Sequence, residues 1–259
     1  MEQNWYPAIA ELVRNGSAAE SAAALAKLVG AAVRHEGTCL IAFHPERTPE
    51  VLHHTLEPEG ASHYLDRYLA GPYLLDPLYQ LSKARRKPGI CRYRDTAPDR
   101  FRSSEYYRQY CEQTHLTDEI DYLVEVGSGT SVVLVVGRRS RRFSQTEVAH
   151  LEALADTVHA AIRNIWQHYG HRVPDSRDAE VAHQRLTRCF DRFGADRLTD
   201  REREITQLLL RGHSTKSVAR ELDIAPGTVM VHKRNLFSKL GISSQYELFS
   251  RFIDELTVA

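Results

Sequence analysis

The chain has 259 residues, 42% of them hydrophobic, so it is long enough to form two domains with buried cores. Its 34 basic and 34 acidic residues give zero formal charge, which excludes a protein drawn to nucleic acid or membranes along its whole length. The four cysteines lie far apart without a C-x-x-C pair, which argues against a structural zinc site and a disulfide framework. The amino terminus lacks the pattern of an export signal, and no run of about 18 apolar residues occurs. We therefore expect a cytoplasmic protein with no membrane span, metal or cofactor.

The first part of the chain alternates helical patterns with short β-rich runs. The Ala-rich stretch 21–37 predicts a helix that ends near Gly37, and residues 38–44 predict a strand. Two further β-rich runs, 119–126 and 131–139, flank the turn-forming tetrapeptide GSGT and predict a β-hairpin. Because a hairpin pairs locally and helical patterns surround it, we expect an antiparallel sheet between helices, an α+β domain with α/β/α layers.

The stretch HYLDRYLAGPYLLDPLYQ, residues 63–80, contains a candidate ligand site. Tyr64 and Tyr68 lie one helical turn apart, and Asp76, followed by a proline, comes eight residues later. A buried carboxylate beside phenols makes a polar corner in an apolar cavity, as a small-molecule site requires. Two structural explanations stay open, because a Tyr pair at this spacing is typical of a core and Asp before Pro is typical of a helix cap. Further candidate contacts are Tyr73, Tyr93 and Ser131, and Tyr106 and Tyr107 add aromatic surface.

A basic run, a long helical pattern and a linker follow the hairpin. We expect the run RRSRR, residues 138–142, to be a solvated turn rather than a DNA contact, since Ser144 is placed to cap the next helix. Residues 144–168 repeat apolar side chains at spacings of three and four, which predicts one buried helix. The polar segment 169–178, with its glycine and proline, predicts a linker, and residues 178–193 predict a connecting helix.

Four short helices are predicted from residue 198 onward. The first opens with a capping box of Thr199 and Glu202, in which each side chain satisfies a backbone N–H. Ser214 is placed to cap the second helix, and Pro226 begins the third, where a missing N–H is tolerated. The tight turn between the second and third helices has helix-turn-helix spacing. Such a geometry projects the amino-terminal half of the third helix, so that it can enter the DNA major groove.

Three motifs in this region occur together: an opening L-T-x-R-E, a G-x-S-x-K before the second helix, and a T-V-x-x-H followed by K-L-G-I. With them, residues 198–244 resemble the DNA-binding domain of the LuxR-type bacterial transcription regulators. Ala225 stands where this family commonly has Ser, and Ser217 stands where a capping box has Glu, so both departures affect helix capping. The resemblance implies phosphate contacts by Ser214, Thr215, Lys216, Thr228, His232 and Lys233.

The third helix has two faces. Its inner, apolar face consists of Val229, Leu236 and Leu240. Met230, Val231 and Arg234 share the outer face and are predicted to meet base edges. Arg234 has the geometry to pair with guanine O6 and N7, whereas Met230 and Val231 offer only apolar contacts, for example with a thymine methyl.

The charge of the predicted DNA-binding region is local. Residues 226–240 contain three basic and no acidic side chains, whereas residues 196–259 contain ten basic and nine acidic ones. One such domain would bind DNA weakly, so we expect a homodimer. The fourth helix carries an apolar stripe of Leu248, Phe249 and Phe252. Two interpretations stay open, a core position or the contact between two DNA-binding domains that the resemblance implies.

The spacing within residues 63–80 is similar to the W-x-x-x-Y…D-P pattern of the acyl-homoserine-lactone-binding domain in quorum-sensing LuxR regulators. There the Trp, Tyr and Asp side chains hold the polar head and amide of the ligand. Here Tyr64 stands for the Trp, and the Tyr-to-Asp spacing is about one residue shorter. We therefore expect a polar ligand different from the usual lactone, such as a plant-derived or metabolic compound. A phosphorylated receiver domain is the alternative input, but it would open with a strand, and this chain opens with helical patterns.

Together these features predict a ligand-sensing domain over 1–168, a linker with a connecting helix over 169–195, and an all-α four-helix DNA-binding domain over 196–259. The predicted function is a ligand-responsive bacterial transcription regulator that binds promoter DNA as a dimer. Its signal is either quorum-sensing-like or, in a LuxR solo, a non-lactone small molecule, and RNA polymerase is a further candidate partner. The alternatives are an enzyme domain or a protein-interaction domain fused to a DNA-binding module. No nucleophile elbow, metal-spaced histidine pair or paired-carboxylate motif supports an enzyme, so no catalytic residue is assigned.

Overall fold

The computed structural model describes residues 5–14, 16–56, 58–84, 89–169 and 177–258. The chain divides into two compact units. The first consists of residues 1–63, 81–96 and 115–180, and the second of residues 64–80, 97–114 and 181–259. Two segments that precede the predicted linker, 64–80 and 97–114, therefore belong to the same unit as the C-terminal helices.

A five-stranded antiparallel sheet is the centre of the first unit. Its strands are β1 (Gly37–Phe43), β2 (Glu50–His54), β3 (Gly89–Arg92), β4 (Asp118–Gly127) and β5 (Thr130–Arg138), in the order β2-β1-β5-β4-β3. The predicted strand and hairpin are confirmed as β1 and as β4 with β5. Their turn bends tightly because Gly127, Ser128 and Gly129 all have positive φ.

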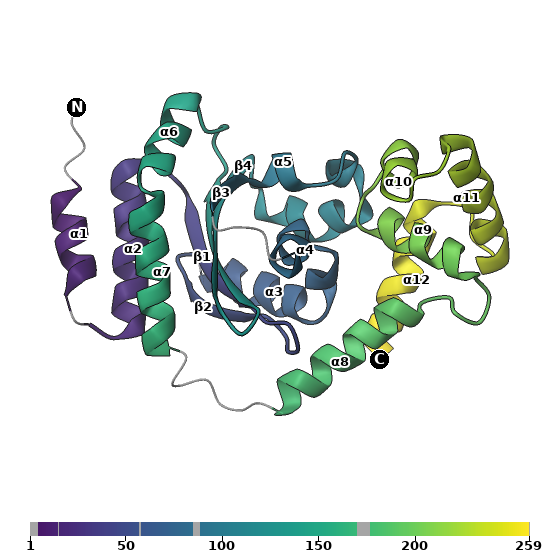
Figure 1. Ribbon diagram of the computed structural model, residues 1–259, viewed down its shortest axis with the longest axis horizontal. Helices are drawn as coiled ribbons and strands as arrows, with labels where there is room; N and C mark the ends of the chain where they lie inside the picture. Colours follow the sequence, from purple (N-terminus) through teal and green to yellow (C-terminus); the bar gives the residue numbers. More distant parts are fainter. Residues whose placement is uncertain (1–4, 15, 57, 85–88, 170–176, 259) are drawn as a thin grey trace. The chain divides into compact units, whose positions relative to one another are not determined.

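Alternate residues of the strands face one helical layer. The inward-facing set consists of Leu40, Ala42, Ile120, Tyr122, Val124, Val132, Leu134 and Val136. They pack against α2 (Ala18–Ala32), α6 (Gln145–Ala153) and α7 (Ala155–Tyr169), and α2 and α7 lie side by side on the sheet in Figure 1. The short helix α1 (Tyr6–Val13) packs on α2. This alternation is the period-2 burial pattern of a sheet with a core on that face.

Two predicted helices differ in length from the observed ones. The Ala-rich helix ends at Ala32 rather than near Gly37, because Val33 is already extended, with φ −147° and ψ 132°. The pattern over 144–168 predicted one helix, but Leu154 separates α6 from α7, and its N–H turns back to the carbonyls of Leu151 and Glu152. The predicted cap is confirmed, since Ser144 and Glu147 form a complete capping box.

The interpretation of RRSRR as a solvated turn is wrong for its first residue. Arg138 ends β5 and is only 1% exposed. Its guanidinium donates to the carbonyl of Arg34 and to Glu147 Oε1 at 2.9 Å, and it lies 4.1 Å from the Phe143 ring centroid. A buried arginine is stable here because carboxylate, carbonyl and ring contacts replace its water.

The remaining helices are α3 (Pro58–Leu69), α4 (Pro77–Lys83), α5 (Tyr93–Thr96), α8 (Arg177–Arg192), α9 (Asp200–Leu210), α10 (Thr215–Glu221), α11 (Pro226–Leu240) and α12 (Gln245–Val258). The last four confirm the predicted helices of the C-terminal region, and α8 lies where the sequence predicts a helix after the linker. Val181 near the start of α8 is apolar but 54% exposed.

The apolar stripe of α12 is part of the core of the second unit. Leu248, Phe249 and Phe252 are all buried. The ring of Phe252 packs edge-on against Phe190 of α8, with 5.5 Å between ring centroids, and against Phe193 just after α8 at the same distance. Within this chain the core interpretation of the stripe therefore holds.

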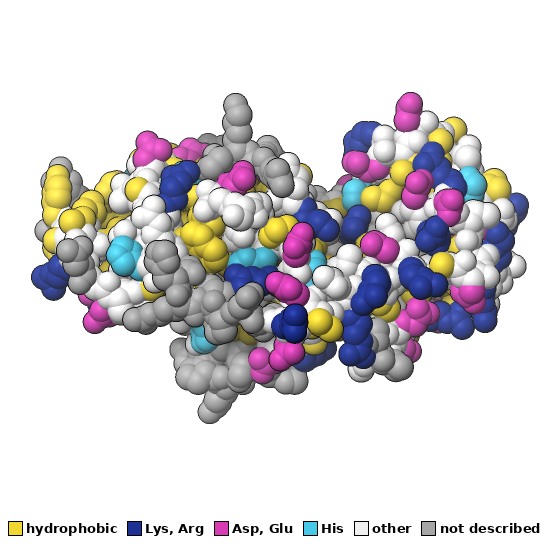
Figure 2. All heavy atoms as spheres, turned by 60° about the horizontal axis from the view of Figure 1, so that its bottom comes forward, with side chains coloured by type: hydrophobic (Ala, Val, Ile, Leu, Met, Phe, Trp, Pro, Cys, Tyr) yellow, Lys and Arg dark blue, Asp and Glu magenta, His cyan; other side chains and the backbone are white. Residues whose placement is uncertain are grey.

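Charge is mixed over the surface in view in Figure 2, where Lys and Arg side chains alternate with Asp and Glu. In the part of the chain that the structure describes, no helix combines the length and the apolar character needed to cross a membrane. Within the predicted linker, residues 170–176 lie outside the described residues, and the domain boundaries stay a prediction.

Candidate nucleic-acid interface and ligand site

The helix-turn-helix is braced by a buried carboxylate at the start of α9. Glu202 accepts hydrogen bonds from the Thr199 backbone N–H at 2.9 Å and from Lys239 Nζ, near the end of α11, at 2.6 Å. Thr199 Oγ1 in turn accepts from the Glu202 N–H, which completes the predicted capping box. Burial opposes ionisation of Glu202, but Lys239 and Thr199 outweigh it and hold its pKa below the usual value.

The start of α10 is capped as predicted. Ser214 Oγ accepts from the Ser217 N–H at 3.1 Å, and Ser217 Oγ lies 2.8 Å from His213 Nδ1. Ser217, which replaces the usual Glu of a capping box, is thus buried and bonded to His213. Ser214 also donates its backbone N–H and its hydroxyl to the carboxylate of Asp99, at 2.9 and 2.5 Å.

The third helix of the region, α11, separates its two faces as the sequence predicts. Val229, Leu236 and Leu240 are buried, and Gly241 ends the helix in the left-handed conformation with φ 66°. On the opposite face Met230 is 64% exposed, and Val231 and Arg234 are exposed as well. Ala225 occupies the cap position in an extended conformation and makes no side-chain cap bond.

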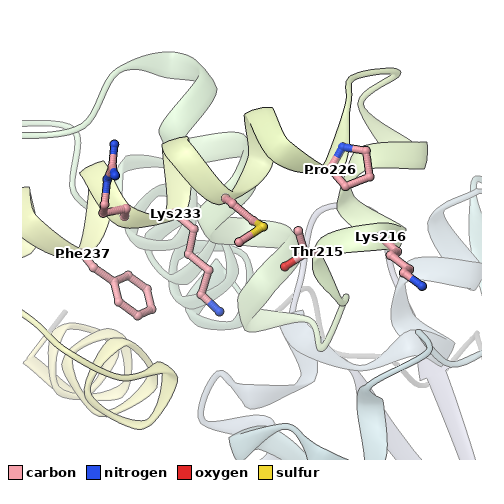
Figure 3. A pocket seen from close by; sticks show the side chains of 7 residues that line it. Thr215, Lys216, Pro226, Lys233 and Phe237 are labelled. Carbon is pink, nitrogen blue, oxygen red and sulfur yellow. The ribbon is translucent and has the colours of Figure 1, made fainter.

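Between α10 and α11 the surface forms a hollow of about 490 Å³. Thr215 and Lys216 from α10 line it together with Lys233 and Phe237 from α11, and the Thr215 side chain points toward Lys233 (Figure 3). The Lys233 ammonium lies 5.4 Å from the Phe237 ring centroid and 3.4 Å from Gln245 Oε1. Burial, together with the charge of Arg100, lowers the pKa of Lys233. Lys216 and Arg234, which also lines the hollow, are exposed, so the hollow has two accessible cations and one partly buried cation.

Thr228 and His232, the other two predicted phosphate contacts, also lie on α11. Thr228 is exposed in its first turn, and His232 is partly buried. The structure therefore brings all nine predicted DNA contacts onto the start of α10 and onto α11.

The predicted ligand residues of 63–80 form a buried polar pair. Tyr68 donates its hydroxyl to Asp76 Oδ2 at 2.7 Å, and the Leu78 N–H donates to Asp76 Oδ1 at 2.8 Å. The ring of Tyr64 stacks on Tyr68 with 6.2 Å between centroids. Asp76 is 7% exposed, so it is both the cap of α4 and a carboxylate beside a phenol in an apolar setting.

The further ligand candidates are distributed over both units. Tyr73 lies beside Tyr68, with centroids 6.3 Å apart, but its hydroxyl is engaged by His183 Nδ1 of α8 at 2.8 Å. Tyr93 begins α5 and Ser131 is buried on β5, and both belong to the first unit. Tyr64, Tyr68, Tyr73 and Asp76 belong to the second unit, so they are gathered there without Tyr93 and Ser131.

The sequence indicated Tyr106 only as a source of aromatic surface, but the structure gives it a place in a buried cluster of rings. It is buried and stacks on Tyr110 with 5.7 Å between centroids. Burial, and then the charge of Asp76, raise the pKa of the Tyr106 phenol well above its usual value. Tyr106 and Tyr110 are four residues apart, and this helical spacing could have predicted that both rings lie on the same face.

Comparison with known proteins gives matches over both halves of the chain. Residues 196–252 match the model of the family described as bacterial regulatory proteins, luxR family. A putative HTH-type transcriptional regulator in the exeN 3' region of Aeromonas salmonicida is 33% identical over 163 residues, which cover 60% of this chain and 82% of that protein. The transcriptional regulatory protein UhpA of Escherichia coli strain K12 is 46% identical over 59 residues, 23% of this chain and 30% of UhpA.

One solved structure resembles the N-terminal part. The domain designated LBD of VqsR from Pseudomonas aeruginosa superposes with a TM-score of 0.57 at 26% sequence identity. The match covers 63% of this chain and 97% of that domain. The expected combination of an α/β region containing an antiparallel sheet with a C-terminal helix-turn-helix is confirmed.

Proposed function

Because the chain belongs to the luxR family of bacterial regulatory proteins, we propose that it binds promoter DNA as a dimer and that a small molecule in the N-terminal region controls this binding. The family consists of transcription regulators rather than enzymes, so the chain is a DNA-binding transcription regulator. We propose a cytoplasmic location, because the proposed binding partner, promoter DNA, lies there.

The observation that carries the DNA proposal is the two-faced helix α11. Its buried face fixes the helix on α9 and α10, and its other face presents Met230, Val231 and Arg234 to solvent. Met230 is 64% and Val231 47% exposed, so both apolar side chains are accessible to a partner on this face. In the major groove Arg234 would donate to guanine O6 and N7, while Met230 and Val231 would contact thymine methyl groups.

The phosphate contacts are assigned to the hollow between α10 and α11 and its rim. Lys216 offers an exposed charge, and Thr215 offers a hydroxyl beside it. Ser214, Thr228, His232 and Lys233 complete the proposed set. Such contacts position the protein on the backbone and carry no sequence information, so specificity rests on Arg234, its two apolar neighbours and DNA shape.

A dimer is proposed from charge. Residues 196–259 are nearly neutral, with ten basic and nine acidic side chains, so one copy has few favourable contacts with the phosphate backbone. Two copies on two half-sites would multiply the weak affinity of each through effective concentration. The apolar stripe of α12, Leu248, Phe249 and Phe252, is buried within the chain, so we do not propose it as the dimer contact. RNA polymerase is proposed as a partner at the promoter on the family relationship alone.

The ligand site is proposed around Asp76 and Tyr68. Their buried hydrogen bond supplies a carboxylate and a phenol to an apolar region, the chemistry that orients a polar group of a small ligand. The likeness of the N-terminal part to the LBD domain of VqsR supports a sensor role. Tyr64 stands where acyl-lactone-binding domains have Trp, which favours a different polar signal from the usual lactone. Tyr73, Tyr93 and Ser131 are retained as secondary candidates.

A ligand screen on the full chain tests the sensor proposal. Small metabolites and signal molecules, including acyl-homoserine lactones, are added and the unfolding temperature is measured. A compound that binds the folded form raises this temperature with concentration. The proposal predicts that Asp76→Asn removes the shift caused by a hit, whereas Asp66→Asn, an exposed carboxyl on α3, retains it. An unchanged shift in the Asp76 variant would remove Asp76 from the site.

A further inference from the structure

Asp99 occupies hydrogen-bond donors that the proposed function assigns to DNA. Its carboxylate accepts from the Ser214 N–H at 2.9 Å and from the Ser214 hydroxyl at 2.5 Å. These are the two donors through which Ser214 would hold a phosphate oxygen. A carboxylate and a phosphate both accept charge-assisted hydrogen bonds from the same donors, so one excludes the other.

The chain around Asp99 is fitted closely to the turn between α9 and α10. The Arg100 N–H donates to the Gly212 carbonyl at 3.2 Å. Gly212 has φ +90°, and a Cβ added to it would lie 3.0 Å from the Cα of Phe101. Two backbones approach this closely only where a side chain is missing, so Gly212 serves the docking of residues 99–101 as well as the end of α9.

The same segment, residues 97–114, reaches the proposed ligand residues at its other end. The Tyr110 ring lies 5.1 Å from the guanidinium of Arg67, the neighbour of Tyr68 on α3. The Tyr106 ring stacks on Tyr110 and packs 5.7 Å from the centroid of Phe101. Tyr110 continues the row of rings to Phe249 of α12, with 6.4 Å between centroids. One segment of 18 residues therefore contacts the start of α10, the core of α12 and the surroundings of Asp76.

We propose that Asp99 is an intramolecular substitute for a DNA phosphate, and that segment 97–114 holds the helix-turn-helix in a form that must release Asp99 before it binds DNA. This inference rests on the proposed function and deepens it, because it assigns the regulation of the DNA-binding site. A ligand that moves Tyr106 would move the chain that carries Asp99. Ligand binding and DNA binding would then be coupled through a contact with two discrete states.

Asp99 carries a negative charge, as a substitute for a DNA phosphate must. Burial opposes its ionisation, but the two bonds from Ser214 and the nearby basic side chains outweigh it, and the pKa of Asp99 lies below its usual value. The carboxylate is therefore ionised at neutral pH and repels a phosphate as well as blocking it. Asp99 remains largely exposed, so salt weakens its hold on Ser214.

The test uses the full chain and mixed-sequence duplex DNA, since phosphate contacts need no particular sequence. Affinity is measured by fluorescence anisotropy at low salt for the wild type and for Asp99→Asn. We expect Asp99→Asn to tighten binding about threefold to tenfold, the range for exposed charge-assisted bonds. The matched control is Glu221→Gln, which removes one exposed acid at the end of α10 without a contact to Ser214 and should change affinity by less than about twofold.

A double variant locates the effect. In a protein that already carries Ser214→Ala, Asp99→Asn should tighten DNA binding by at most half as much as it does in the wild type. The reason is that the Ser214 hydroxyl, which Asp99→Asn would make available to a phosphate, is then absent. Hydrogen exchange of the DNA-free protein gives a second readout, in which the Ser214 amide should exchange faster in Asp99→Asn. Melting curves of each variant check that the fold is intact.

The possible outcomes separate the two proposals. If the wild type binds DNA and Lys216→Ala weakens binding, but Asp99→Asn resembles Glu221→Gln, the phosphate-substitute inference is wrong and the proposed function stands. Binding by Asp99→Asn alone, with none by the wild type, would support the inference strongly. Absence of binding by the wild type and by Asp99→Asn would overturn both.

Discussion

Replacement of Glu202 by alanine is the sharpest test of how the helix-turn-helix is held together. The Glu202 carboxylate joins the start of α9 to the end of α11 through Thr199 and Lys239. Alanine removes the acceptor of both bonds and leaves the Thr199 N–H and the Lys239 ammonium to find other partners. Because α11 carries the proposed DNA contacts, its support on α9 bears directly on function.

The expected loss follows from the burial of the three groups. A hydrogen bond to a charged group contributes about 1.5 to 3 kcal/mol, and the loss of a capping interaction costs about 1 kcal/mol. The Lys239 side chain is 39% exposed, so it returns to water and the full penalty of an unpaired buried charge does not apply. We expect Glu202→Ala to lower the free energy of unfolding by about 2 to 3 kcal/mol, a large share of a typical total.

Urea unfolding of the full chain, followed by far-UV circular dichroism, measures this loss. The matched control is Glu204→Ala on the same helix, where an exposed pair with Arg201 contributes at most about 1 kcal/mol. If the two variants differ by less than about 0.5 kcal/mol, the reasoning about Glu202 is refuted.

The effect of pH supplies an independent check on Glu202. The folded state holds the pKa of Glu202 below its ordinary value of 4.5, so its contribution to stability is complete above pH 4.5. The contribution is lost as pH falls through the lower, folded pKa. The difference between the wild type and Glu202→Ala should therefore shrink below about pH 4.5.

Two further predictions concern the start of α11 and the proposed ligand site. Ala225→Ser should raise the free energy of unfolding by about 0.5 to 1.5 kcal/mol, measured by urea unfolding, because position 225 already has the extended cap conformation and lacks a side-chain bond; Ala225→Val, which has no acceptor, should show no gain. Tyr68→Phe should weaken ligand-dependent thermal stabilisation while Asp76 keeps its bond from Leu78, and full stabilisation in the variant would place the ligand away from Tyr68.

The C-terminal helices were predictable from the sequence because capping residues at their ends mark where each helix begins or stops. Thr199 with Glu202 marks the start of α9, Ser214 caps α10, and Pro226 and Gly241 bound α11. Each of these capping interactions joins residues about four positions apart, so it can be recognised in the sequence without knowledge of the fold. The hairpin of β4 and β5 was predictable for the same reason.

Long-range contacts were beyond such patterns. Arg138 stands in a basic run that indicates solvent, and only its contacts with Arg34 and Glu147 explain its burial. Asp99 is separated from Ser214 by 115 residues, and no local signal connects them. The Tyr68 and Asp76 pair was predictable in part. Their separation of eight residues suggested that the two side chains lie close together, but it could not distinguish a helix cap from a polar ligand site. The structure shows that one carboxylate makes both contacts.

The central claim is that the exposed face of α11 around Arg234 contacts bases, while the start of α10 and the hollow between α10 and α11 contact phosphates. It is tested most directly by the affinity of the full chain for duplexes selected from a random library, measured over a salt series for Arg234→Ala and Lys216→Ala. The account predicts that Lys216→Ala weakens all duplexes alike and lowers the salt slope by about 1. Arg234→Ala should instead reduce the preference for selected over random duplexes by about tenfold. An Arg234→Ala protein that retains both the affinity and the preference of the wild type would contradict the account.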